Sequence, residues 1–164
     1  MLRVSDVWER ALHAPALADV SSPGDVIIIR SGASYDGRQG MTLATGVSSR
    51  SAGAQALCLH LVTIPPRTRG VPHMHEGHES AIYTVSGETE VWHGEGLRQC
   101  TVVKAGDFMY VPPGTPHLPV NRSDVTTVAV VARTDPQEQE SVVTLSLPPH
   151  LSDLIAFPVA SGQS

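Results

Sequence analysis

The sequence predicts an all-β protein. Glycine and proline are abundant, with 14 and 13 residues among 164, whereas aromatic and charged residues make up only 4% and 16% of the chain. Short segments rich in apolar and β-branched residues recur at close intervals and are separated by Gly, Pro, Asn or Asp turns. Many short strands punctuated by such turns indicate a β-sandwich or barrel rather than a helical fold.

The first expected element is a helix. Ser5 is a suitable N-cap, and apolar side chains that include Trp8 and Leu12 follow it at helical spacing. This pattern predicts a short amphipathic helix over residues 5–13.

Strands are expected from residue 26 onward. The β-branched run at 26–30 predicts a strand, and the Gly- and Ser-rich residues 31–41 predict a loop. The alternating segment 56–64 predicts a strand that ends at Pro65, because proline cannot donate to a strand ladder. Further strands are expected at 71–75, 80–86, 89–93, 98–104, 107–111, 117–120, 125–133 and 141–147.

These elements predict a single barrel without internal repeats. We expect an N-terminal helix and arm over residues 1–25, the β-barrel over 26–150 and a C-terminal tail over 151–164.

Charge and hydropathy exclude two classes of partner. The formal net charge is −5, and no cluster of Lys or Arg forms the basic patch that nucleic acids require. No apolar run approaches the roughly 20 residues of a membrane span, and the first ten residues carry Asp6 and Glu9 where a signal peptide would be basic and apolar. We therefore expect a soluble, cytoplasmic protein whose partner is a small molecule.

Three histidines indicate a metal site. His73 and His75 are two residues apart, so on a strand their side chains point to the same face and can bind one ion. His117 follows a Pro- and Gly-rich turn, whose rigid backbone can direct its ring toward the same ion.

These residues stand in two motifs, and with them the chain resembles the RmlC-like cupin superfamily, in particular its single-domain bacterial members of unassigned reaction. The first motif is read as Gly70, His73, His75, Glu79 and Gly87. The second is matched at every position by Gly106, Pro112, Gly114, His117 and Asn121. The resemblance implies a double-stranded β-helix, or jelly-roll, barrel and one divalent ion bound by His73, His75, Glu79 and His117.

The carboxylate ligand is the uncertain position of the first motif. Seven residues rather than six separate Glu79 from Gly87, so strict counting selects Ser80. Glu79 shares its strand face with the apolar Tyr83, and the more apolar face is expected to point into the barrel. We therefore predict Glu79 as the ligand, with a bulge absorbing the extra residue and His78 as the alternative.

The predicted ligand set suits several ions and several reactions. Three imidazoles and a carboxylate are compatible with iron or manganese, which we favour, and also with zinc, nickel or cobalt. Glu79 and Tyr83 are the candidate catalytic residues. The resemblance favours a dioxygenase or a metal-assisted lyase or isomerase, and the alternative is a non-catalytic module that binds or senses a small molecule.

Self-association is also expected. Single cupin-like barrels usually pair, and the apolar face of the predicted N-terminal helix offers additional surface, so the chain is predicted to form a homodimer.

Overall fold

The computed structural model describes residues 25–30, 34–137, 139, 141–153 and 155–160. The helix predicted over 5–13 lies outside these residues. In the part of the chain that is described, no helix has the length and apolar character needed to cross a membrane.

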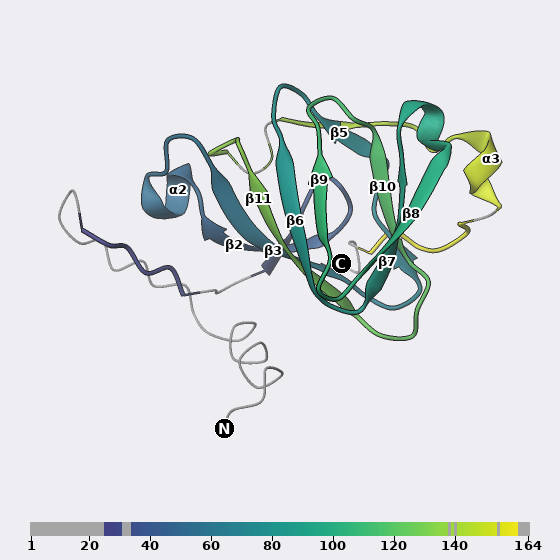
Figure 1. The fold of residues 1–164 in the computed structure, drawn as a ribbon, viewed down its shortest axis with the longest axis horizontal. Helices are drawn as coiled ribbons and strands as arrows, with labels where there is room; N and C mark the ends of the chain where they lie inside the picture. The colour runs from purple at the N-terminus through teal and green to yellow at the C-terminus, as the bar shows by residue number, and fades with distance from the viewer. Residues whose placement is uncertain (1–24, 31–33, 138, 140, 154, 161–164) are drawn as a thin grey trace.

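Two antiparallel sheets make up the fold, as predicted for an all-β chain (Figure 1). The first sheet runs in the order β1 (Ser34–Asp36), β2 (Thr42–Val47), β3 (Cys58–Ile64), β11 (Thr127–Arg133), β6 (Ser80–Ser86) and β9 (Phe108–Val111). The second runs in the order β12 (Val142–Thr144), β5 (His73–His75), β10 (His117–Asn121), β7 (Glu88–His93) and β8 (Gln99–Lys104), and β4 (Thr68–Arg69) also pairs with β10. The helical turns are α2 (Ser49–Ala52), η1 (Glu95–Leu97) and α3 (Pro149–Ser152).

Turn chemistry explains how neighbouring strands connect. Gly87 joins β6 to β7 with a φ of +77°, a left-handed conformation that glycine adopts without a steric cost. A Cβ atom at this position would lie 2.8 Å from Oγ1 of Thr127, so the turn also packs too closely against β11 for any side chain.

The N-terminal strands differ from the prediction. The strand expected at 26–30 does not form: only Ile29 makes a β-bridge there, and Val26 is 84% exposed. Instead β1 forms within the segment predicted to be a loop, and β2 follows it. The reason is burial: Leu43 on β2 is fully buried in the core, whereas the apolar run at 26–30 has no comparable packing.

The hydrophobic core consists of two clusters, one between the two sheets and one on the outer face of the second sheet. Inside, the buried cluster consists of Met41, Leu43, Val62, Ile64 and Val131. Outside, Leu151 and Ile155 are fully buried together with Leu118 and Val120 of β10. The segment that contains α3 therefore covers the outer face of the second sheet (Figure 1).

The short strand β5 lies between two partners in the second sheet. On one side, Val142, Val143 and Thr144 of β12 pair in register with His75, Met74 and His73. On the other side, His73 pairs with His117 of β10. β5 is thus held by strands from two distant parts of the chain.

Candidate metal centre

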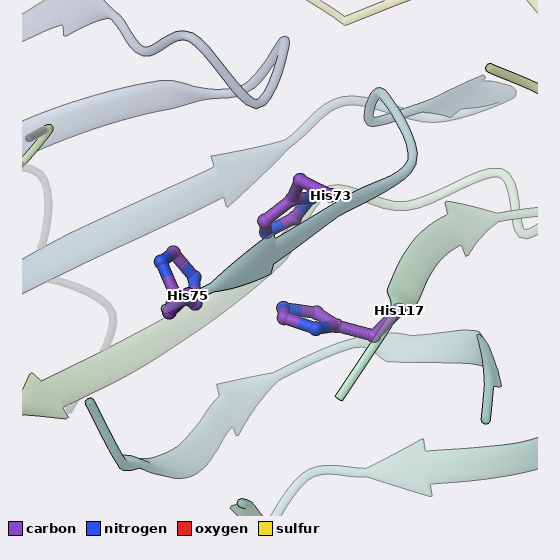
Figure 2. A group of neighbouring side chains, drawn as sticks. All are labelled: His73, His75 and His117. Atoms are coloured by element: carbon purple, nitrogen blue, oxygen red, sulfur yellow. The ribbon is translucent and has the colours of Figure 1, made fainter. Parts of the chain in front are cut away.

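The structure brings three predicted ligands together. His73 and His75 point from β5, and His117 points from the adjacent strand β10 (Figure 2). The ring centroid of His73 lies 4.2 Å from that of His117 and 5.1 Å from that of His75. One ring nitrogen of each residue lies within 4.8 Å of the others, close enough for all three to bind one ion.

Backbone carbonyls fix the orientation of two of the rings. Nδ1 of His73 donates to the carbonyl of Val71 at 2.7 Å, and Nδ1 of His117 donates to that of Thr115 at 2.9 Å. Each Nε2 therefore keeps its lone pair for a ligand bond, the usual arrangement of a metal-binding histidine. Nδ1 of His75 is buried without a hydrogen-bond partner in the described part of the chain. The three side chains thus fit a transition ion.

The environment keeps the histidines neutral. Burial is the main cause that lowers the pKa of all three: to about 2 for His75, to about 4 for His117 and well below its ordinary value for His73. The guanidinium of Arg133 lowers each of these pKa values further. Neutral imidazole is the form that binds metal, so no proton has to be displaced at neutral pH.

Glu79, the predicted fourth ligand, is not brought to this site. Its side chain is exposed, and its backbone amide donates to Oγ1 of Thr134 at 3.0 Å. Ser80 is 2% exposed and lines the cavity between the sheets instead. The inference from strand parity was wrong, because the outer face of the first sheet, which carries Tyr83, is itself apolar.

The other two candidates also lie away from the three histidines. Tyr83 is exposed on the outer face of β6, where its ring lies 4.7 Å from that of Phe108 on β9. His78 is partly exposed, and its Nδ1 donates to the carbonyl of Thr134 at 2.7 Å. Neither residue lines the cavity.

Arg133 is the main site residue that sequence reasoning missed. It ends β11, is only 4% exposed, lines the cavity and donates from Nε to Oγ of Ser80 at 3.2 Å. A signal was present: Arg133 has the same strand parity as Ala129 and Val131, which also face the cavity. His60 on β3 also lines the cavity.

The cavity has a volume of about 70 Å³. Its walls come from both sheets and are largely apolar, with Val62, Ile82, Val91 and Met109 among the lining residues. The polar side chains of the three histidines, Ser80 and Arg133 stand among these apolar walls. A cavity with a mainly apolar lining and a few polar side chains is typical of a small-molecule binding site.

Comparison with known proteins supports the assignment of the fold. The family model of the cupin domain matches residues 60–133, which include all three histidines and Arg133. A search of curated protein sequences gave no match.

Solved structures share the same architecture. The polyketide cyclase RemF from Streptomyces resistomycificus is 22% identical, with a TM-score of 0.57 over 84% of this chain and 94% of the cyclase. A Bacillus subtilis oxalate decarboxylase variant is also 22% identical, with a TM-score of 0.63, but the match spans 77% of this chain and only 35% of the decarboxylase. A Klebsiella pneumoniae protein with a double-stranded β-helix domain is 17% identical, with a TM-score of 0.55 over 65% of this chain and 84% of that protein.

At these identities the similarity concerns the fold. The matched domain and the shared double-stranded β-helix together show that residues 60–133 of this chain form a cupin domain.

Proposed function

We propose that this protein is a metal-dependent enzyme that binds one divalent transition ion on His73, His75 and His117 and acts on a small organic molecule in the adjoining cavity. The observation that carries the proposal is the group of three buried imidazoles, with ligand atoms within 4.8 Å of one another. Burying three imidazoles in an apolar interior is unfavourable unless they have a partner, and a metal ion would supply one.

The ligand set narrows the choice of ion. Imidazole suits iron, cobalt, nickel, copper and zinc, whereas manganese prefers carboxylate oxygens. Because Glu79 lies outside the site, we favour iron over manganese as the bound ion. With an octahedral ion, three protein ligands leave three positions open for substrate or O₂.

The reaction class follows from what the cavity offers. A bound ion supplies Lewis-acid polarisation of a substrate oxygen and, if it is redox-active, a binding position for O₂. The apolar walls exclude water, while Ser80 and Arg133 hold polar groups of the substrate by hydrogen bonds. We favour a dioxygenase if the ion is iron and a lyase or isomerase if it is zinc.

The first test is metal content. Protein purified without chelator is expected to hold close to one equivalent of a transition ion per chain, measured by elemental analysis. Metal removal is expected to lower the thermal midpoint, since a ligand at a hundred times its Kd stabilises the native state by about 2.7 kcal/mol. Less than a tenth of an equivalent, with no uptake on reloading, would contradict the proposal.

The second test separates the reaction classes. The Fe(II) protein is mixed with catechols, β-diketones and thiols in an oxygen electrode, and parallel samples are followed for product under anaerobic conditions. Oxygen uptake that requires both iron and substrate is expected for a dioxygenase, whereas anaerobic turnover identifies a lyase or isomerase. Binding of these compounds without any turnover would favour a binding or sensing module.

We also propose that two copies pair through the outer face of the first sheet. Exposed apolar side chains gather there, and Phe108 and Tyr110 are 84% and 59% exposed. Phe108 and Tyr83 pair across β9 and β6, so the patch is continuous. A two-fold dimer buries the same patch on both copies.

Light scattering is expected to give twice the chain mass of 17.4 kDa. Phe108→Glu is expected to shift the protein toward the monomer, because a charge would be buried in an apolar interface. Val125→Glu is the matched control, since Val125 is also exposed but lies in the turn between β10 and β11. Equal dissociation of both variants would argue against this face.

A further inference from the structure

The cavity contains no acidic side chain to balance a bound cation. Among the described residues that line it, none is Asp or Glu, and Arg133 is the only Lys or Arg. Histidine binds a metal ion as neutral imidazole, so three histidine ligands supply no negative charge. A divalent ion on them would therefore bring its full charge into an interior where an unbalanced charge is costly.

Arg133 adds to this positive charge. Burial lowers its pKa from the ordinary value of 12.5, but arginine remains protonated in proteins. The buried Asp135 raises the pKa of Arg133 and so offsets part of its charge. Even if the negative charge of Asp135 cancels the positive charge of Arg133 completely, no acidic side chain among the described lining residues neutralises the two positive charges of the ion.

The same end of the cavity offers hydrogen-bond donors. The guanidinium of Arg133 lines the same cavity as the three histidines. Ser80 accepts a hydrogen bond from Arg133, and its hydroxyl group can itself donate one. A guanidinium and a hydroxyl beside a metal site match the oxygens of a carboxylate.

We propose that the substrate is a small organic carboxylate, anchored jointly by the ion on the three histidines and by Arg133 with Ser80. The inference rests on the proposed function, because it takes that ion as given. The volume of about 70 Å³ limits the substrate to a few non-hydrogen atoms beyond the carboxylate.

The test uses the full-length protein loaded with Co(II), whose visible spectrum reports ligand binding. Propionate and propionamide have nearly the same shape, but only the first is an anion. The unmodified protein is expected to bind propionate at least about tenfold more tightly than propionamide. Equal affinities would overturn the inference without the need for any variant.

A variant then assigns the preference to Arg133. Arg133→Gln is expected to weaken propionate binding by about ten- to a hundredfold and propionamide binding by much less, while Co(II) content stays the same. If that variant does not fold, Arg133→Lys replaces it. Its propionate affinity is expected to be intermediate, because lysine keeps the positive charge but lacks the planar guanidinium that can donate two parallel hydrogen bonds to a carboxylate. Unaltered propionate affinity in the variant that folds would overturn the role of Arg133.

The outcomes distinguish the two proposals. If the unmodified protein takes up no Co(II) or other transition ion, the proposed function fails, and the carboxylate inference fails with it. If Co(II) binds but acid and amide are not discriminated, the metal site stands and only the carboxylate inference is wrong.

Discussion

Replacing His117 with glutamine is expected to weaken the binding of a divalent transition ion by at least about a hundredfold, since changing even the outer partners of a metal ligand costs ten- to a hundredfold. His117 supplies one of three imidazoles and is held by the carbonyl of Thr115. Glutamine fills a similar volume, but its amide is a poor ligand for such ions. Competition with a chromophoric chelator measures the loss.

Glu79→Gln is the matched control for this substitution. The Glu79 side chain is exposed and outside the cavity lining, so its neutralisation is expected to leave metal affinity unchanged. Circular dichroism and the thermal midpoint of the metal-free forms show whether both variants fold. A loss of affinity in Glu79→Gln as large as that in His117→Gln would mean that Glu79 reaches the ion.

Acidification is expected to destabilise the metal-free protein steeply below about pH 6.5. In the unfolded chain, histidine binds a proton near pH 6.5, whereas in the native state burial delays protonation to about pH 4 for His117 and about pH 2 for His75. Between these values the unfolded state binds more protons, so native stability falls as the pH falls. Each such histidine removes about 1.4 kcal/mol per pH unit.

Urea denaturation of the metal-free protein from pH 7 to pH 4 measures this slope. His117→Gln removes one of the buried groups, so its stability is expected to depend less on pH. His150→Gln is the control, because His150 is exposed. A wild-type stability that is flat between pH 6.5 and 4 would contradict the neutral, buried state of these histidines.

The sequence is sufficient to predict the three histidines because local rules position them. Residues two apart on a strand share a face, which places His73 and His75 together. His117 begins β10 directly after the turn that contains Gly114, whose φ is +68°. The contact between β5 and β10 is a long-range one that no local pattern specifies, and only the family resemblance predicted it.

The parity argument failed at Glu79 for a physical reason. It assumes that the more apolar face of a strand points into the barrel. On β6 the inward face instead carries Ser80 and Thr84 beside Ile82, whereas the apolar Tyr83 lies on the outer face. When polar side chains face the interior and apolar ones face outward, alternation no longer tells inside from outside. The spacing to Gly87 was the better guide, since the Gly87 turn fixes the register of β6.

Arg133 and the strands β1 and β2 were missed for different reasons. Arg133 ends a strand whose other inward residues are uncharged, and a charged residue at a strand end is normally assigned to the surface. β2 contains an alanine and a glycine, which are depleted in strands, so its β-signal is weak. Its pairing with β3 over several residues, a tertiary contact, decides its structure.

The pairing of β5 with β12 has a consequence for the timing of assembly in the cell. The ribosome releases His73 and His75 long before it releases Val142 to Thr144, which hold their strand on one side. During translation the nascent chain therefore presents two histidines on a strand without its neighbour, and the three-histidine site is held on both sides only after β12 has emerged. An ion bound at this site would then be selected from the metals available once β12 is in place.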